Sequence, residues 1–376
     1  MAAIMKKIGI LTFHSAMNYG AVLQTFALYR TVQKLGYNPI VINRQATTIF
    51  SGTIRSIIRY LLISILPIEL CACNKKLYVA KRFYLFLQKY LPKKTIPYFT
   101  NTQLHHARFD IQCIITGSDQ IWNYNLSERQ SPGMGLNMFV DFLPDQIKRI
   151  AYAASFGNNS WCYDKVITSK VYCLMDKYTA ISVRERSGVN ICRDVFGKSA
   201  EAVLDPTLLL ESTEYDKLIQ DEPNIDSESY ILIFKFNWDT EFCKLITSIA
   251  HNSKISVCSI NSKVKDNSYK TVYFPTVGQW LAYIKNAKMV ITDSFHALAF
   301  SIIFNRPFVV LNNGFEERMD RQLDLIKALG FENRYLKCDE VMDKLSSLMD
   351  IEYDNAKNVL LDRKTKSINF LKRNLK

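Results

Sequence analysis

The sequence predicts an α/β protein built from two doubly wound domains that face each other across a cleft, with a basic helical insertion in the first domain. Two sets of short apolar runs alternate with helically spaced segments, a pattern typical of parallel sheets covered by helices. The 376 residues also exceed what one hydrophobic core usually holds. We expect a first domain over residues 1–210, a second over 228–345 and a helical tail over 346–376.

The first domain opens with a strand, a helix and a second strand. Lys7–Phe13 is a nearly continuous apolar run, as in a buried parallel strand. A polar loop ends at Gly20, residues 21–35 have helical spacing up to Gly36, and Tyr37–Asn43 is the next strand. Further strands are expected over residues 113–116, 149–154, 180–184 and 202–204.

The insertion, at about 51–100, carries much of the net charge of +13. It contains nine Lys or Arg residues and one acid, Glu69. Its first part is strongly apolar and its second part, 75–94, is basic and aromatic. Such a segment suits the surface of an anionic membrane. The alternative is a pair of amphipathic helices that cap the domain while their Lys and Arg side chains are solvated.

The second domain follows an acidic, loop-like stretch around 208–229, where we place the boundary. Its expected strands cover residues 230–236, 255–260, 271–274, 289–292 and 308–311. Helices are expected over 240–252, 277–287 and 297–304, and the chain is helical again from Lys327 onward.

The segment from Ala287 to Asn313 contains the first group of candidate site residues. Its strand, 289–292, runs directly into Asp293, Ser294 and, two residues later, His296. Polar residues at the carboxyl end of a strand face the ligand crevice in such folds, and the following helix offers N–H groups to an anion. The alternative is that an Asp or Ser here only caps the helix and that the histidine packs in the core.

Other strand ends provide further polar candidates, and some residues at or near these ends have a structural interpretation. The candidates are Asn18, Tyr19, Ser118, Asp119, Gln120, Arg184, Lys235 and Asn237. Trp122 is a sugar-stacking face or a core anchor. Arg184 holds a phosphate or carboxylate, or it pairs with a nearby acid. Asp205 is read as a structural turn and cap.

Several common kinds of chemistry lack their motifs. The chain has no GxSxG, Walker or HExxH sequence and no convincing dinucleotide fingerprint. His105 and His106 are adjacent and lack the spacing of metal ligands on a helix, so no metal and no other cofactor is expected. Nucleic acid is not an expected partner, because charge alone is weak evidence for it.

The nine cysteines form no CxxC pair, and no apolar run reaches the roughly 20 residues that span a bilayer. The chain also begins without the pattern of a signal peptide. We therefore expect reduced thiols in a cytoplasmic protein, with peripheral contact to the inner face of the membrane if residues 51–100 dock there.

Seven motifs in order resemble those of the polysaccharide pyruvyl transferase family. They are ILTFHSAMNYGAVLQTFAL, TGSDQIWN, AYAASFG, SVRERSG, VLDPTLLL, WLAYIKNAKMVITDSFHALAFSIIFNRPFVV and EERMDRQLDLIKALG. Together they cover nearly the whole chain apart from Thr47–Thr100. The resemblance implies two Rossmann-like domains in a GT-B-like arrangement. It also implies a transferase that moves pyruvate from phosphoenolpyruvate to a sugar as a ketal, in the synthesis of capsule, exopolysaccharide or a lipid-linked precursor.

The implied chemistry assigns roles to the candidates. Protonation of the enol methylene needs a general acid, for which His296 is suited. Attack by the sugar hydroxyls needs a base, Asp119 or Asp293. The donor's phosphate and carboxylate need cations or helix N–H groups. The residues expected to bind the substrates are Asn18, Tyr19, Ser118, Arg184, Lys235, Ser294 and Arg318.

One position departs from the family pattern. Many members carry an arginine two residues before the histidine, whereas this chain has Ser294. Arg306, Arg318, Arg321 or Lys235 could supply the missing cation. Two other functions stay open: a GT-B-type glycosyltransferase that uses a sugar nucleotide, and a non-catalytic protein that binds a glycan or phosphate.

Overall fold

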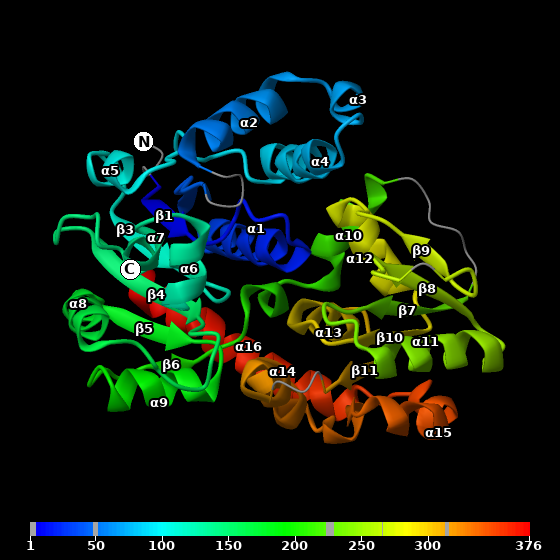
Figure 1. The fold of residues 1–376 in the computed structure, drawn as a ribbon. Coiled ribbons are helices and arrows are strands. Elements are labelled where there is room, and N and C mark those ends of the chain that lie inside the picture. The colour runs from blue at the N-terminus through cyan, green and yellow to red at the C-terminus, as the bar shows by residue number, and fades with distance from the viewer. Residues whose placement is uncertain (1–4, 48–51, 223–228, 265, 313–315) are drawn as a thin grey trace. The chain divides into compact units, whose positions relative to one another are not determined.

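The computed structural model describes residues 5–47, 52–222, 229–264, 266–312 and 316–376 (Figure 1). The chain forms two compact units, and each is an α/β domain. The first consists of residues 1–209 together with 363–376, and the second of 210–362. A two-domain, doubly wound α/β fold is thus confirmed, while the expected cleft between the domains stays a prediction.

The first unit contains a parallel sheet of six strands in the order β2-β1-β3-β4-β5-β6. The strands are β1 (Lys7–Leu11), β2 (Asn38–Val41), β3 (Cys113–Thr116), β4 (Lys148–Ala154), β5 (Ala180–Val183) and β6 (Glu201–Ala202). The chain moves from β1 to β2 on one side and then to β3 on the other. The direction of winding therefore reverses between β1 and β3, which is where ligands bind in open α/β sheets.

Helices and short helical turns connect these strands or follow the last of them. They are α1 (Tyr19–Lys34), α5 (Asn101–His105), α6 (Tyr124–Gln130), α7 (Met134–Asn137), α8 (Lys165–Met175), α9 (Arg186–Asp194) and the 3-10 turn η2 (Pro206–Leu209). Trp122 lies in the core of this unit. Its indole is fully buried and stacks on Phe139 with ring centroids 5.3 Å apart. Trp122 is therefore a core anchor, and the sugar-stacking alternative is wrong.

The insertion is helical, as expected, and forms α2 (Thr53–Ile65), α3 (Ile68–Cys71) and α4 (Lys75–Tyr90). Helix α4 packs against α1 through an aromatic contact between Phe83 and Tyr19, with centroids 5.3 Å apart. Helix α2 packs on α4 in turn, and Figure 1 shows it on the outer side of α4. Lys81 differs from the solvated lysines expected here, because it is buried and its Nζ donates to the Ile63 carbonyl at 2.7 Å.

The second unit contains another six-stranded parallel sheet, in the order β12-β11-β10-β7-β8-β9. The strands are β7 (Tyr230–Phe234), β8 (Ser256–Ile260), β9 (Lys270–Val272), β10 (Met289–Thr292), β11 (Phe308–Leu311) and β12 (Tyr335–Leu336). The winding here reverses between β7 and β10. Both strands are completely buried, as expected of central parallel strands.

The helical elements of this unit are α10 (Ser212–Gln220), α11 (Thr240–Asn252), α12 (Val277–Asn286), α13 (Phe295–Ile303), α14 (Glu316–Leu329), η3 (Glu332–Arg334) and α15 (Cys338–Leu348). Helix α16 (Asp354–Leu375) begins in the second unit and ends in the first. Within the described residues, no helix is both long and apolar enough to cross a membrane.

Two elements differ from the expectation. The acidic stretch expected to be loop-like contains helix α10, because Tyr215 and Leu218 recur at helical spacing and are buried. The stretch after Lys327 contains the two-residue edge strand β12, which pairs with β11 through Tyr335 and Leu336. A strand this short has no period of its own that a sequence pattern can reveal.

Candidate functional site

The carboxyl edge of the second sheet brings Lys235 and Asp293 together at its reversal point. Asp293 follows β10 and Lys235 follows β7, and these strands are neighbours. Lys235 Nζ lies 3.9 Å from Asp293 Oδ2 and 3.6 Å from Asp239 Oδ2. The side chains of Lys235 and Asp293 are each 1% exposed. This edge therefore carries a buried cation between two carboxylates.

Asp293 also fixes the loop that follows β7. Its Oδ1 accepts from the Phe236 N–H at 2.9 Å, and its Oδ2 from the Asn237 N–H at 3.3 Å. Burial raises the pKa of the Asp293 carboxyl above its usual value, although these hydrogen bonds and the Lys235 charge oppose the shift. Asp293 is thus a structural clamp between two strand ends as well as a candidate base.

Helix α13 begins directly at this edge. Ser294 is its N-cap, and the Ser294 Oγ accepts from the Ala297 N–H at 3.4 Å. His296 lies in the first turn, is 7% exposed and has its ring edge-on to Phe295 with centroids 5.3 Å apart. Of the two capping residues considered, Ser294 is the one that caps the helix. His296 sits at the strand edge but is largely buried.

Gln322 on α14 belongs to this edge and was missed by the sequence reasoning. It is 3% exposed, and its Nε2 donates to the Asp293 carbonyl at 2.9 Å. Its buried Oε1 has no hydrogen-bond partner among the described residues. The sequence carries one signal for Gln322, its place in the family motif EERMDRQLDLIKALG. The arginines of that motif are among the residues predicted to supply a cation.

The remaining cations proposed to replace the family arginine lie in different places. Arg306 precedes β11 and is therefore at the amino edge of the sheet, away from the site. Arg321 lies on α14, one residue before Gln322. Arg318 is also on α14, but its side chain lies outside the described part of the structure. Lys235 is the cation whose position at the edge is defined by contacts.

The reversal point of the first sheet holds a closed polar network around Ser118. The Ser118 N–H donates to Gln24 Oε1 at 3.2 Å, and its carbonyl accepts from Thr12 Oγ1 at 3.0 Å. Gln24 Nε2 completes the network by donating to Thr12 Oγ1 at 2.8 Å. Ser118 is fully buried. Its main role is therefore to join β1, α1 and β3.

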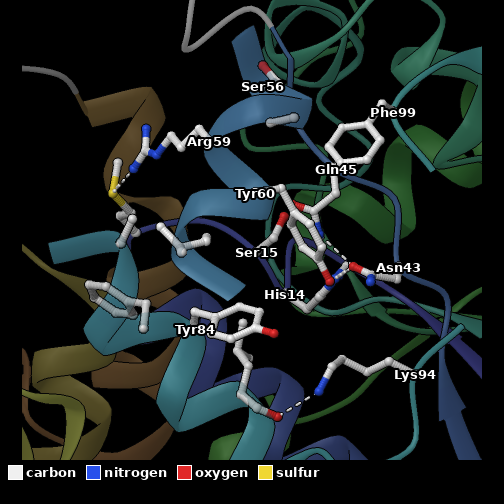
Figure 2. A pocket seen from close by; sticks show the side chains of 16 residues that line it. His14, Ser15, Asn43, Gln45, Ser56, Arg59, Tyr60, Tyr84, Lys94 and Phe99 are labelled. Atoms are coloured by element: carbon white, nitrogen blue, oxygen red, sulfur yellow. Dashed lines mark hydrogen bonds between the residues drawn. The ribbon is translucent and has the colours of Figure 1, made fainter. Parts of the chain in front are cut away.

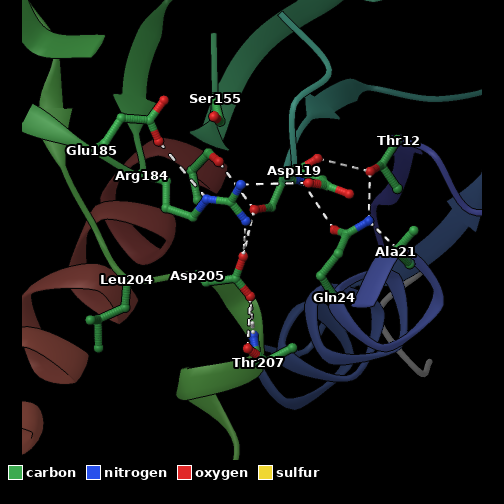
Figure 3. Close-up of polar contacts among 12 residues, drawn as sticks. Thr12, Ala21, Gln24, Asp119, Ser155, Arg184, Glu185, Leu204, Asp205 and Thr207 are labelled. Carbon is green, nitrogen blue, oxygen red and sulfur yellow. Dashed lines mark hydrogen bonds and ion pairs between the residues drawn. The ribbon is translucent and has the colours of Figure 1, made fainter. Parts of the chain in front are cut away.

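Arg184 pairs with nearby acids, the alternative to binding a phosphate or carboxylate of the substrate. Its guanidinium lies 2.8 Å from Asp205, 3.5 Å from Asp119 and 3.9 Å from Glu185 (Figure 3). Burial disfavours its charge, but the three carboxylates outweigh burial and raise the pKa of Arg184. Because three acids surround one cation, this cluster disfavours an added anion. Asp119 is its most accessible member, with a side chain 16% exposed.

Asp205 has the structural role expected of it. Its Oδ1 accepts from both the N–H and the Oγ1 of Thr207, at 3.0 and 2.8 Å, which caps the turn η2. Its Oδ2 accepts from Ser118 Oγ at 3.0 Å. Asp205 therefore ties η2 to the end of β3.

Asn18 and Tyr19 both contribute to the start of α1. The Asn18 side chain caps the helix by accepting from the Ala21 N–H at 3.1 Å. Tyr19 is 6% exposed and contacts the insertion. These contacts are structural, and binding of substrate by either residue stays a prediction.

A pocket of about 80 Å³ lies in the first unit between the ends of β1 and β2 and helices α2 and α4 (Figure 2). His14 lies against it, completely buried, with Nε2 2.9 Å from Asn43 Oδ1 and Nδ1 3.2 Å from the Thr12 carbonyl. Burial lowers the pKa of His14. Burial also lowers the pKa of Lys94 to about 8 and that of Arg59 to about 10.

The polar loop that ends at Gly20 and the basic insertion line this pocket, although no local sequence pattern predicts it. Within the described residues, no group of three His, Cys, Asp or Glu side chains is arranged to hold a metal ion. Each of the nine cysteines is a free thiol.

Two parallel sheets, each with polar residues at the carboxyl edge of its reversal point, define a two-domain Rossmann-like α/β protein. Similar folds occur in a putative UDP-N-acetylglucosamine 2-epimerase from Listeria monocytogenes, with a TM-score of 0.57, 7% identity and coverage of 95% of this chain and 91% of that chain. Arabidopsis thaliana UGT89C1 is also similar, with a TM-score of 0.51, 9% identity and coverage of 98% of both chains. At these identities the likeness concerns the fold alone.

The sequence also matches a protein family over most of its length. The model of the polysaccharide pyruvyl transferases matches residues 18–314. The chain belongs to the polysaccharide pyruvyl transferase family, as the motifs predicted, and this membership implies a transferase that acts on a glycan. No curated protein sequence matches the chain significantly.

Proposed function

We propose that the protein transfers pyruvate from phosphoenolpyruvate to two hydroxyls of one sugar in a surface glycan, or in its lipid-linked precursor. The match to the family model over residues 18–314 is the observation that carries this proposal. The carboxyl edge of the second sheet supports it, because a histidine, a carboxylate and a lysine lie at one reversal point.

The reaction balances without a redox partner. A proton adds to the methylene carbon of phosphoenolpyruvate, and a sugar hydroxyl attacks the cationic carbon that results. Phosphate then leaves as its C–O bond breaks, and the second hydroxyl closes the ketal. The two hydroxyl protons are accounted for by the new methyl group and the departing phosphate. The chemistry thus requires an acid, a base and a site for the anionic donor.

His296 is the proposed acid, since an imidazole exchanges protons near neutral pH. Asp293 is the base that the same domain supplies, and Asp119 is the alternative base from the first domain. Lys235, at the end of the neighbouring strand β7, is the proposed cation in place of the family arginine that residue 294 lacks. The first turn of α13 adds N–H groups for an anion.

The test incubates the protein with phosphoenolpyruvate and glycan or lipid-linked acceptors. We expect one phosphate released per pyruvyl group gained by the acceptor, and in D₂O we expect one solvent deuteron in the new methyl group. Turnover of a sugar nucleotide in place of phosphoenolpyruvate would instead indicate a glycosyltransferase. Binding of glycan without turnover of either donor would indicate a non-catalytic relative, which the uncharged Ser294 would then explain.

His296→Asn tests the acid. We expect kcat to fall by about 10²–10⁴, the usual contribution of a positioned acid or base. His106→Asn is the matched control, because His106 is an exposed histidine directly after α5 whose Nδ1 lies 2.8 Å from the Thr102 carbonyl oxygen. If His296→Asn unfolds the protein and leaves the activity of the folded fraction intact, His296 is a packing residue.

A further inference from the structure

Helix α2 presents an apolar stripe to solvent. Five large aliphatic side chains on it are 40–76% exposed. They are Ile54, Ile58, Leu61, Leu62 and Ile65. These positions recur at helical spacing, so they form one continuous face about 100° wide. Leu70 on the adjacent α3 is also 60% exposed.

The opposite face of α2 is the one that the fold uses. Ser56 is buried, and its Oγ donates to the Thr47 and Gly52 carbonyls at 2.9 and 3.0 Å. Tyr60 packs edge-on against Tyr84 and Phe99, with centroids 6.0 and 5.6 Å apart. Since these contacts hold α2 on the domain, the outer stripe contributes little to folding.

The charge around this stripe is strongly one-sided. The first 109 residues contain fifteen Lys or Arg, of which Arg44 and Lys81 are buried, and a single acid, Glu69, whereas the whole chain has a net charge of only +13. The remaining residues therefore carry slightly more acids than bases. Arg55 is exposed and flanks the stripe on the helix surface, and α2 contains no acid. The stripe thus belongs to a surface that attracts anions.

We propose that the stripe of α2 inserts into the interface of an anionic membrane. An apolar helix face flanked by basic residues binds such a surface through buried apolar area and attraction to anionic lipids together. A second copy of the chain fits less well, since pairing this face with itself would bring like charges together. The membrane would also be the place where a lipid-linked acceptor is met, a consequence that rests on the proposed function.

Vesicle flotation tests the proposal, using the full chain without donor or acceptor. We expect binding to vesicles that contain phosphatidylglycerol, weaker binding to phosphatidylcholine alone, and weakening as salt is added. The pair Ile58→Ser and Ile65→Ser should lower the affinity about a hundredfold, since each buried aliphatic side chain contributes about tenfold. Arg55→Gln should lower it about fivefold.

The matched control is the pair Val166→Ser and Leu361→Ser, on α8 and α16. These aliphatic side chains are 65% and 63% exposed, against 51% and 76% for Ile58 and Ile65. The control pair should bind vesicles like the unmodified protein. Equal effects of the two pairs would overturn the proposal, because exposed apolar area in general would then explain the binding.

Two further measurements address insertion and self-association. In Ile58→Trp, brominated lipid should quench the added fluorescence, and no quenching would overturn insertion. Light scattering should give the same mass for the unmodified protein and the Ile58/Ile65 pair. If the unmodified protein is a dimer that does not bind vesicles, and the Ile58/Ile65 double variant is a monomer, the stripe binds a second copy of the chain. Vesicle binding in a protein that fails to transfer pyruvate would refute the proposed function and leave this proposal standing.

Discussion

Lys235 and Asp293 show how the same two residues serve the fold and the candidate chemistry. Each side chain is almost completely buried, and neither would be tolerated there alone. Asp239 and the Asn237 carbonyl also contact Lys235. Removing either partner should therefore lower stability, so its effect on the proposed activity must be measured separately.

Lys235→Met should destabilise the protein by about 3–5 kcal/mol near neutral pH, because it leaves the Asp293 carboxylate buried without its cation. Burial already raises the pKa of Asp293, and loss of Lys235 raises it further. A folded state with a raised carboxyl pKa binds more protons than the unfolded state, so stability falls as pH rises through that pKa. The loss should therefore be larger at about pH 8 than at about pH 5.

Urea unfolding of both proteins at the two pH values measures this difference. Lys263→Met is the control, since Lys263 is an exposed lysine that donates to the Phe236 carbonyl at 2.8 Å in the same loop. This substitution should lower the free energy of unfolding by less than about 1 kcal/mol, independently of pH. A pH-independent loss in Lys235→Met would contradict the coupling to Asp293.

Ser294→Arg restores the family's usual residue and tests what the uncharged position does. The helix cap is lost, so stability should fall by about 1 kcal/mol, whereas Ser294→Asp should keep the cap. If a cation at this position grips the donor, the KM for phosphoenolpyruvate should fall in Ser294→Arg and rise in Ser294→Asp. Equal KM values in the two variants would show that the donor does not reach residue 294.

Which polar residues end the strands could be predicted from the sequence, but what each one contacts could not. Apolar runs that stop at Asp293 or Ser118 mark the edge of the sheet reliably. The partner of the Asp293 carbonyl is Gln322, on a helix 29 residues later. Lys81 lies in a basic segment yet is buried against the Ile63 carbonyl. Such contacts depend on how elements pack, which a local pattern does not contain.

At the scale of the element, how well a strand or helix can be predicted depends on how many of its residues are buried. Central strands such as β7 and β10 are apolar at every position and were therefore visible in the sequence. Edge strands β6 and β12 have two residues each. Helix α10 was hidden because it lies in the acidic stretch 208–229, although its few apolar residues do the packing.

Gly117 directly follows β3, at a position where the backbone admits only glycine. Its φ is +129°, and an added Cβ would lie 1.9 Å from the Tyr152 carbonyl oxygen. Gly117→Ala should therefore cost at least about 3 kcal/mol through backbone strain and displacement of β4. Gly36→Ala is the control, because its φ of +86° is also positive but nothing lies within 4 Å of the added Cβ.

Gly36→Ala should cost about 1 kcal/mol, the strain term without the clash. Chemical denaturation of the two variants measures both values. Similar losses in the two would mean that β4 moves aside easily at Tyr152, and the end of β3 would then be less rigid than its contacts indicate.

At the scale of the whole molecule, the C-terminal segment decides how the first domain is completed. Residues 363–376 belong to the first unit although the second unit precedes them in the chain. Phe370 packs against Tyr152 with ring centroids 6.2 Å apart, and the Leu204 N–H donates to Ser367 Oγ at 3.0 Å. The first domain therefore needs both ends of the chain before its core is closed.

Leu371→Ala tests that dependence. Leu371 is completely buried at the end of α16, so the truncation should destabilise the first domain by about 2–5 kcal/mol. Leu361→Ala, on the same helix with a side chain 63% exposed, should cost less than about 0.5 kcal/mol. Hydrogen exchange should show lost protection in β3 and β4 of the Leu371 variant and unchanged protection in β7 and β10. Equal losses in both sheets would mean that the two domains unfold as one cooperative unit, in which case the C-terminal helix stabilises the whole molecule and not the first domain alone.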